Sequence, residues 1–272
     1  MKLEGIEMKL TVVQPCFFQE GESDKKIRDF LKCEMDKLER DEILLLPEYS
    51  NAGGLTDKER ELVAVKTADE MLSYAKKTAR EKEGYIGINL LRYENETLRN
   101  STYLIDKNGN EHYIYNKVHI PPVEKELGVI RGKGDCVCTL DDITFAFMTC
   151  YDMYYNEQIE YIAKYKPDII LVSGYQRGER EDIIRAQSKL LAFRTNAYLL
   201  RSSYSMNSDT KGGCSMIVKP NGEILADMGK NVGHVSVNEN VKWKYMRSAG
   251  YGGDTVRNDD FINYGLCPEA FD

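Results

Sequence analysis

The sequence predicts a single α/β domain built on mixed β-sheets. Short apolar runs alternate with longer amphipathic stretches along the 272 residues, a pattern typical of strands covered by helices. Tight-turn sequences between some of the apolar runs add antiparallel hairpins to the expected parallel strands. No linker of Pro and Ser residues and no repeat divides the chain. We therefore expect one domain over residues 1–272, with residues from about 245 to 272 as a C-terminal loop or tail.

Each predicted strand is a short apolar run. In chain order these are Lys9–Val13, Ile43–Pro47, Tyr85–Leu91, Asn100–Ile105, His112–Tyr115, Ile143–Thr149, Asp168–Val172, Tyr198–Ser203, Met216–Lys219, Glu223–Ala226 and His234–Val237. The sequence Lys-Asn-Gly-Asn at 107–110 predicts a hairpin turn, because Asn-Gly readily adopts the positive φ angles such turns require. Pro-Asn-Gly at 220–222 predicts a second tight turn.

Apolar residues at helical spacing predict the helices. The first follows Ser23, an expected N-cap, and presents Ile27, Leu31 and Met35 on one face. The others are expected at Asp57–Arg80, Asn156–Tyr165 and Glu181–Thr195. Because these helices fall between predicted strands, they favour an α/β class over an all-β one.

Composition excludes several classes of partner. The net charge of −7 argues against a nucleic-acid or anionic-membrane ligand, since both attract basic proteins. The N-terminal sequence MKLEGIEMKL lacks the apolar core of a signal peptide, and no apolar run approaches the length of a membrane span. We therefore expect a cytoplasmic protein whose seven cysteines are free thiols.

Three reactive side chains follow predicted strands. Glu48 ends the sequence ILLLPE, Lys117 ends IYNK and Cys150 ends FAFMTC. Open α/β folds build their sites where strands end, although each residue alone also fits a solvated charge or a buried thiol. Together they suit covalent catalysis, because a glutamate takes the thiol proton and a lysine stabilises an oxyanion.

The segments LLLPEYS around Glu48, NKVHIPP around Lys117 and FMTCYDMYYNE around Cys150 resemble the three catalytic motifs of the nitrilase, or carbon–nitrogen hydrolase, superfamily. They occur in the family's order and with its spacing. The later segments KPDIILVSG, LLAFRTNAYLLRSS and GGCSMIVKPNGEILA are similar to the family as well, so the resemblance covers nearly the whole chain.

The resemblance implies a four-layer α-β-β-α sandwich that hydrolyses non-peptide C–N bonds without a metal or an organic cofactor. It implies Cys150 as the nucleophile, Glu48 as the general base and Lys117 as the oxyanion-side cation. The backbone N–H of Tyr151 is the implied second oxyanion donor. The resemblance further implies a homodimer or higher homo-oligomer, formed by packing helices across sandwiches.

Many members of that family carry a second glutamate shortly before a Gly-Asp or Gly-Asn pair. The pair here is Gly134-Asp135, and Glu126 is the better match in spacing, with Glu124 as the alternative. Either glutamate also fits a solvated loop charge. We therefore predict Glu126 as the second acid.

The expected substrate is a small linear amide or an N-carbamoyl compound. Tyr151-Asp152 after the cysteine is similar to the amidase and carbamoylase branches, whereas nitrilases usually carry Trp-Glu there. Tyr175, Gln176 and Arg177 follow the strand DIILVSG and are expected to line the substrate pocket. Alternatives are an N-carbamoyl-amine hydrolase acting on polyamine-type or β-amino substrates, and a nitrilase.

Other classes of function and site have less support. A catalytically silent binding protein on the same fold has no need for all three reactive residues. A thiol redox sensor requires Cys150 to have a low pKa. The Cys136-Val137-Cys138 pair lacks the further ligands of a zinc site, so no metal is expected.

Overall fold

A computed structural model describes residues 5–17, 24–53, 57–206, 208, 210–250, 252–267 and 270. The side chains of residue 24 and of residues 57–65 lie outside this description. The expected N-cap Ser23 also lies outside the described residues.

The first sheet has six strands in the order β12-β1-β2-β3-β4-β5. Its strands are β1 (Glu7–Gln14), β2 (Glu42–Leu45), β3 (Tyr85–Glu94), β4 (Thr97–Ile105), β5 (Glu111–Asn116) and β12 (Gly233–Asn240). The central strands β1, β2 and β3 run parallel, and antiparallel neighbours extend the sheet on both sides. The expected hairpin connects β4 and β5, with Gly109 at a φ of 77°.

The second sheet has the order β11-β10-β9-β8-β7-β6. Its strands are β6 (Val137–Leu140), β7 (Ile143–Thr149), β8 (Ile169–Ser173), β9 (Tyr198–Ser202), β10 (Met216–Val218) and β11 (Ile224–Asp227). Here β7, β8 and β9 are parallel and the outer strands are antiparallel. In each sheet, therefore, three neighbouring parallel strands end side by side at their carboxyl ends.

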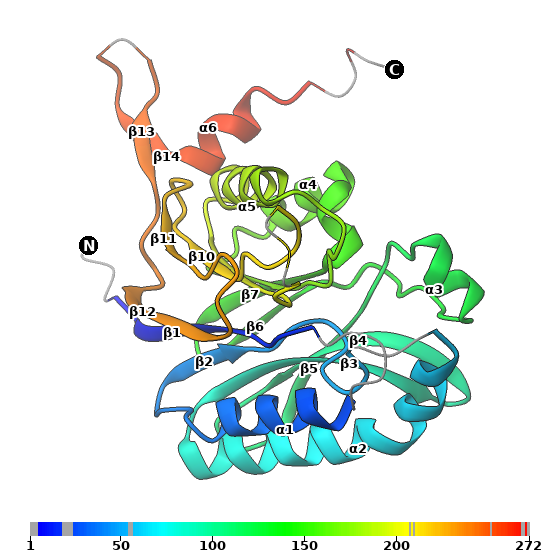
Figure 1. Ribbon diagram of the computed structural model, residues 1–272. Helices are drawn as coiled ribbons and strands as arrows, with labels where there is room; N and C mark the ends of the chain where they lie inside the picture. Colours follow the sequence, from blue (N-terminus) through cyan, green and yellow to red (C-terminus); the bar gives the residue numbers. More distant parts are fainter. Residues whose placement is uncertain are drawn as a thin grey trace.

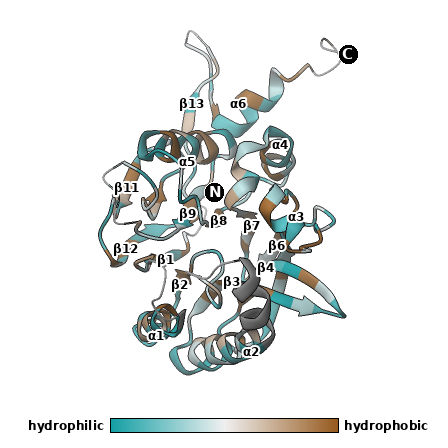
Figure 2. Cartoon of the chain, turned by 45° about the vertical axis from the view of Figure 1, so that its right-hand side comes forward, coloured by the Kyte–Doolittle hydropathy of each residue, from teal (hydrophilic) through white to brown (hydrophobic). Residues whose placement is uncertain are grey.

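Helices cover the outer face of each sheet (Figure 1). The first sheet is covered by α1 (Asp24–Met35) and α2 (Asp57–Lys82), and the second by α4 (Asn156–Lys164) and α5 (Glu181–Thr195). This arrangement confirms the expected four-layer α-β-β-α sandwich. Figure 2 shows that α1 and α5 carry both hydrophilic and hydrophobic residues, as helices between a sheet and solvent require.

Two apolar clusters hold the layers together. One includes Leu10 and Leu45 of the first sheet with Phe147 and Leu171 of the second, so it joins the sheets face to face. The other includes Leu31 of α1 packed with residues of α2 and the first sheet. Burial of these side chains fixes the distance between the sheets, whose strand ends carry the predicted site.

The predicted strands are all present with ends that differ by a few residues, but several short elements were not predicted. These are β6, α3 (Pro122–Glu126), the 3₁₀ turn η1 (Cys150–Tyr154), β13 (Met246–Ser248), β14 (Thr255–Arg257) and α6 (Asn258–Tyr264). They are too short for hydrophobic periodicity to reveal.

Part of the expected C-terminal loop or tail is regular structure. The strands β13 and β14 form an antiparallel hairpin, and α6 follows directly. Buried polar side chains anchor α6 to the domain: Asn258 Nδ2 donates to Phe193 O over 2.6 Å, and Asn196 Nδ2 donates to Asp259 Oδ1 over 2.7 Å. These hydrogen bonds hold α6 against the domain. They join residues that are distant in sequence, so local sequence patterns do not predict them.

Candidate active site

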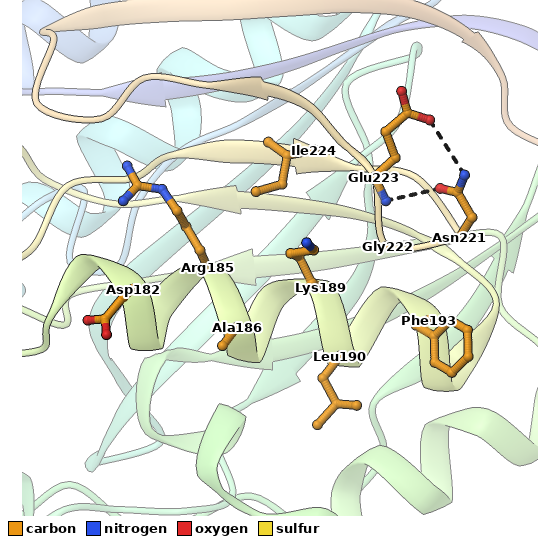
Figure 3. A pocket seen from close by; sticks show the side chains of 10 residues that line it. All are labelled: Asp182, Arg185, Ala186, Lys189, Leu190, Phe193, Asn221, Gly222, Glu223 and Ile224. Atoms are coloured by element: carbon orange, nitrogen blue, oxygen red, sulfur yellow. Dashed lines mark hydrogen bonds between the residues drawn. The ribbon is translucent and has the colours of Figure 1, made fainter.

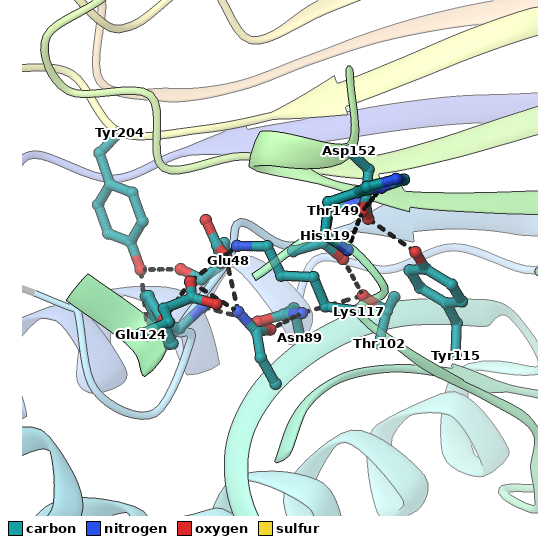
Figure 4. Close-up of polar contacts among 12 residues, drawn as sticks. Glu48, Asn89, Thr102, Tyr115, Lys117, His119, Glu124, Thr149, Asp152 and Tyr204 are labelled. Carbon is teal, nitrogen blue, oxygen red and sulfur yellow. Dashed lines mark hydrogen bonds and ion pairs between the residues drawn. The ribbon is translucent and has the colours of Figure 1, made fainter. Parts of the chain in front are cut away.

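The loops after β2 and β5 bring Glu48 and Lys117 into direct contact (Figure 4). Lys117 Nζ lies 2.8 Å from Glu48 Oε1 and 2.7 Å from Glu124 Oε1. The side chains of Lys117 and Glu48 are each 1% exposed, and that of Glu124 is 5% exposed. One ammonium group therefore joins two carboxylates that are shielded from water.

The glutamate that joins Glu48 at Lys117 is Glu124, the alternative candidate, and not Glu126, which the spacing in the sequence favours as the second acid. Glu126 is exposed at the end of α3, whereas Glu124 is buried and points to Lys117. The two residues are two positions apart on a helix, so their side chains point in different directions. Sequence spacing alone did not resolve which of them faces inward.

Further polar side chains fix the two carboxylates, and sequence reasoning did not identify them. Asn100 Nδ2 donates to Glu48 Oε1 over 2.7 Å and to Glu124 Oε1 over 3.3 Å. Tyr49 Oη donates to Glu124 Oε1 over 2.6 Å. Asn100 belongs to β4, where its sequence context is that of an ordinary strand residue. Its burial in a polar cluster depends on tertiary packing, which the sequence pattern does not show.

The backbone after β2 is held in an unusual conformation. Tyr49 has a φ of 58°, which bulky side chains seldom adopt. Its N–H donates to Asn89 Oδ1 over 2.9 Å, and Tyr204 Oη donates to the carbonyl oxygens of Glu48 and Tyr49 over 2.8 and 3.2 Å. Such conformations persist where their surroundings compensate for the strain, and they are frequent at functional sites.

Cys150 occupies a sharp turn between a strand and a helix. It follows the last residue of β7, Thr149, has a φ of 47° and begins the 3₁₀ turn η1. The side chain is half-buried. A positive φ directly after a strand projects the side chain from the sheet edge, as in the nucleophile elbow of the α/β-hydrolase fold.

Asp152 fastens this turn to the loop that carries Lys117. Its Oδ2 accepts the Thr149 N–H over 2.7 Å and the Tyr115 hydroxyl over 2.7 Å. Its Oδ1 accepts the His119 N–H over 3.0 Å and lies 2.9 Å from His119 Nδ1. A single buried carboxylate thus connects the end of β7 to β5 and to the segment after it.

The electrostatics keep Lys117 charged and Cys150 protonated. Burial alone would lower the pKa of Lys117, but the charges of Glu48 and Glu124 outweigh it and hold the pKa above its usual value. Burial raises the pKa of the Cys150 thiol well above its usual value; the charge of Glu48 adds to this, and Lys117 opposes it. Burial also raises the pKa of Glu124, against the effect of Lys117.

The raised pKa of Cys150 contradicts the premise of the redox-sensor hypothesis, which required a thiol with a low pKa. A protonated thiol needs a base at the moment it attacks. The carboxylate cluster provides candidate bases whose charges already act on this sulfur.

The predicted pocket residues lie beside Cys150 in different environments. A backbone hydrogen bond from Tyr175 favours the Cys150 thiolate, and the Tyr175 ring packs edge-on against Tyr49 at 5.4 Å between centroids. Gln176 is buried, whereas Arg177 is exposed with its guanidinium 4.8 Å from the centre of the Tyr175 ring. The structure thus brings Tyr175 to the cysteine and places Arg177 at the surface above it.

Tyr151 is the first residue of η1 after Cys150. Its ring contacts the rings of Tyr154 and Tyr155 at centroid distances of 5.7 and 5.2 Å. The backbone N–H of Tyr151 as an oxyanion donor stays a prediction.

A wide groove of about 860 Å³ lies apart from these residues, between α5 and the turn that precedes β11 (Figure 3). Its lining includes Arg185, Leu190 and Phe193 of α5 and Asn221 of the turn. None of the predicted site residues lines it.

Comparison with known proteins defines the class. Residues 37–240 match the family model of the carbon–nitrogen hydrolases, so the chain belongs to the carbon–nitrogen hydrolase family and is an enzyme of that class. The matched range contains Glu48, Lys117 and Cys150.

Individual relatives agree with this class. The chain is 22% identical over 207 residues to a protein of Staphylococcus aureus described as a hydrolase in the agr operon, with 74% of this chain and 78% of that protein covered. Its fold is similar to that of an amidase from Nesterenkonia sp., with a TM-score of 0.74, 18% identity, and coverage of 88% of this chain and 92% of that one. A mutant of the Nesterenkonia sp. AN1 amidase, with the acetamide moiety of fluoroacetamide added covalently at its active-site cysteine, matches with a TM-score of 0.76, 17% identity and coverage of 98% and 97%.

Within the described ranges, no helix has the length and apolar character of a membrane span. The part of the chain that the structure describes also contains no group of three or more His, Cys, Asp or Glu side chains placed to hold a metal ion.

Proposed function

We propose that this carbon–nitrogen hydrolase is an amidase that cleaves a small linear amide or N-carbamoyl compound through a thioester on Cys150. The observation that carries the proposal is the buried contact of Lys117 with Glu48 and Glu124, beside a cysteine in a strained turn. A binding protein has no need to bury three charged groups next to a thiol.

In the first step Glu48 takes the proton of the Cys150 thiol while the sulfur attacks the carbonyl carbon of the substrate. The oxygen of the tetrahedral intermediate becomes negative and is stabilised by the Lys117 ammonium and the Tyr151 N–H. Glu48 then passes its proton to the leaving nitrogen. The C–N bond breaks, ammonia or an amine departs, and the acyl group stays on sulfur as a thioester.

In the second step Glu48 removes a proton from the water that attacks the thioester. The C–S bond breaks, the acid is released, and the proton returns to the thiolate. Glu124 supports both steps as a second contact that holds the Lys117 ammonium in place. The mechanism requires no metal or organic cofactor.

Ammonia release from a panel of short amides, N-carbamoyl compounds and nitriles tests the proposal. We expect turnover on an amide or carbamoyl compound and its loss in Cys150→Ala. Cys33→Ala is the matched control, because Cys33 is an exposed thiol on α1. No turnover by the wild type on any compound would favour a catalytically silent binding protein on the same fold.

The panel also separates the alternatives. Faster turnover of N-carbamoyl amines of the polyamine or β-amino type would identify the carbamoyl-amine hydrolase, and faster turnover of nitriles would identify a nitrilase. Tyr151-Asp152 after the cysteine supports the amidase and carbamoylase branches over the nitrilase.

We also propose a homodimer that works in the cytoplasm. Tyr161 of α4, Tyr165 at the C-terminal cap of that helix and Leu190 of α5 have exposed side chains on the outer helical layer. This exposure supports helix packing against a second copy. Among the described residues the seven cysteines form no disulfide, as a reducing compartment favours. Gel filtration at the monomer mass of 31.2 kDa would contradict the dimer.

A further inference from the structure

Arg201 is a buried guanidinium without a carboxylate partner among the described residues. It lies on β9, is 0% exposed, and is among the largest side chains that the fold buries completely. Its Nε is buried without a hydrogen-bond partner within the described part of the chain. Burying an unpaired charge costs free energy, so we expect this arginine to have a function that offsets its cost to stability.

The guanidinium connects three segments of the second sheet. Nη2 donates to Gln176 Oε1 over 2.9 Å, in the segment after β8. Nη1 donates to the carbonyl oxygens of Gly213 and Cys214 over 2.7 and 3.0 Å, in the segment before β10. Arg201 therefore determines where the segment that ends at Gln176 lies.

That segment touches both sides of the candidate active site. The carbonyl oxygen of Gly174 accepts the Glu48 N–H over 3.3 Å, and the next residue, Tyr175, forms the backbone hydrogen bond to Cys150. Gly174 also packs closely on the arginine, because a Cβ there would lie 3.3 Å from Arg201 Nη2. The chain from Gly174 to Gln176 thus lies between the arginine and the two reactive residues.

We propose that Arg201 is a positioning residue of the active site: through Gln176 it fixes the Gly174–Gln176 segment against Glu48 and Cys150, and its unpaired positive charge favours the thiolate of Cys150. This inference rests on the proposed function of Cys150 as the nucleophile.

The electrostatic part depends on the groups that face the sulfur. Five titratable side chains act on Cys150: Tyr154 of the same turn η1, and Glu48, Lys117, Glu124 and Arg201 from other segments. Glu48 and Glu124 disfavour the thiolate and Lys117 favours it. Arg201 stays charged, because an arginine does not lose its proton in a protein even where burial lowers its pKa. Its charge therefore adds to that of Lys117 on the favourable side.

The test measures alkylation of Cys150 by iodoacetamide between pH 7 and 9, followed by peptide mass spectrometry, together with kcat and KM on an amide. The variants are Arg201→Met, which removes the charge and the planar set of guanidinium donors, and Arg201→Lys, which keeps the charge but not that set of donors. Gln176→Leu keeps the arginine and removes its link to the segment, together with the longer contacts of Gln176 Nε2 to Tyr154 Oη over 3.5 Å and to Gln187 Oε1 over 3.3 Å. Arg185→Met is the control, because Arg185 is a partly exposed arginine paired with Asp227 and Glu181.

We expect Arg201→Met to slow alkylation about threefold across this pH range, which corresponds to a rise of about 0.5 in the pKa of the Cys150 thiol. Its kcat falls at least about tenfold with KM changed less than about threefold, because the reacting groups rather than substrate binding are displaced. Arg201→Lys restores the alkylation rate but not the full kcat. Gln176→Leu lowers kcat with alkylation unchanged, and Arg185→Met changes neither.

Alkylation and kcat of folded Arg201→Met within about 1.5-fold of the wild type, well short of both expected changes, would overturn the inference. If Arg201→Met does not fold, Gln176→Leu decides: unchanged kcat overturns the positioning role. If the wild type hydrolyses no amide, the proposed function fails by itself. The alkylation rates of Arg201→Met and Arg201→Lys then still decide whether this charge acts on Cys150.

Discussion

The ammonium nitrogen of Lys117 lies 2.8 Å from Glu48 Oε1 in a place where both side chains are 1% exposed. The two residues come from loops that follow different strands of the first sheet, 69 positions apart in the chain. Glu124 Oε1 is a second contact of the same ammonium nitrogen, at 2.7 Å. The cluster carries two potential negative charges and one positive charge, and its stability depends on Lys117.

Replacing Lys117 by Met leaves two buried carboxyl groups without their cation. We expect a loss of about 3 kcal/mol in the free energy of unfolding, because removing one partner of a buried ion pair leaves the other charge buried without compensation. Amide turnover falls at least about 100-fold with the loss of the oxyanion cation. Urea denaturation and ammonia release measure the two effects. Lys125→Met is the control, since Lys125 is exposed on the neighbouring α3; equal effects in both variants contradict the account.

Glu124→Gln and Glu126→Gln separate the two candidates for the second acid. Glu124 contacts Lys117, Tyr49 and Asn100, whereas Glu126 is exposed. We expect kcat/KM on an amide to fall at least about tenfold in Glu124→Gln, a typical effect of removing a charge-assisted contact near the reacting atoms. It stays unchanged in Glu126→Gln. A loss confined to Glu126→Gln would restore the sequence-based preference.

Replacing Asp152 by Asn tests the connection between the Cys150 turn and the Lys117 loop. The two carboxylate oxygens accept hydrogen bonds from Thr149, Tyr115 and His119, and an amide group turns its NH₂ toward some of these donors. We expect a loss of about 2 kcal/mol in the free energy of unfolding and a lower kcat. Asp142→Asn, in the exposed turn between β6 and β7, is the control. Wild-type stability and kcat in Asp152→Asn would refute the connection.

Stability should also depend on the protonation of His119. Burial alone would lower the pKa of His119, but the hydrogen bond and charge of Asp152, followed by those of Glu157, outweigh it and raise the pKa. A raised pKa in the folded state means that the stabilisation is complete below the unfolded value of about 6.5. It is then lost as the pH rises through the folded value.

We therefore expect His119→Gln to destabilise the protein more at pH 5.5 than at pH 9, as measured by urea denaturation at the two pH values. His112→Gln is the control, because the His112 ring contacts a backbone carbonyl oxygen, that of Thr139. An equal destabilisation by His119→Gln at both pH values would show that the charge of His119 contributes nothing.

The sequence allowed prediction of Glu48, Lys117 and Cys150 because each follows a strand, and strand ends are visible as the end of an apolar run. The four-layer arrangement was predictable from the resemblance of the surrounding motifs to a known family. Both depend on patterns that are local in the chain.

The remaining parts of the site depend on contacts between distant segments. Asn100 and Arg201 lie within strands, where a polar residue usually faces solvent, and only contacts with segments distant in the chain bury them. The choice between Glu124 and Glu126 depends on the direction of one short helix, which has no periodicity to read.

The most direct test of the proposed mechanism is the detection of the acyl group bound covalently to Cys150. Glu48→Gln is incubated for hours with a short amide at pH 9, because the raised pKa of the Cys150 thiol leaves only a small ionised fraction that can attack without a base. The protein is then quenched in acid and digested for peptide mass spectrometry. The account predicts a peptide containing Cys150 that is heavier by the acyl group, because the variant cannot activate water to release it. No such adduct forms in the variant that also carries Cys150→Ala. An acyl group on another residue, or wild-type turnover by Cys150→Ala alone, would contradict it.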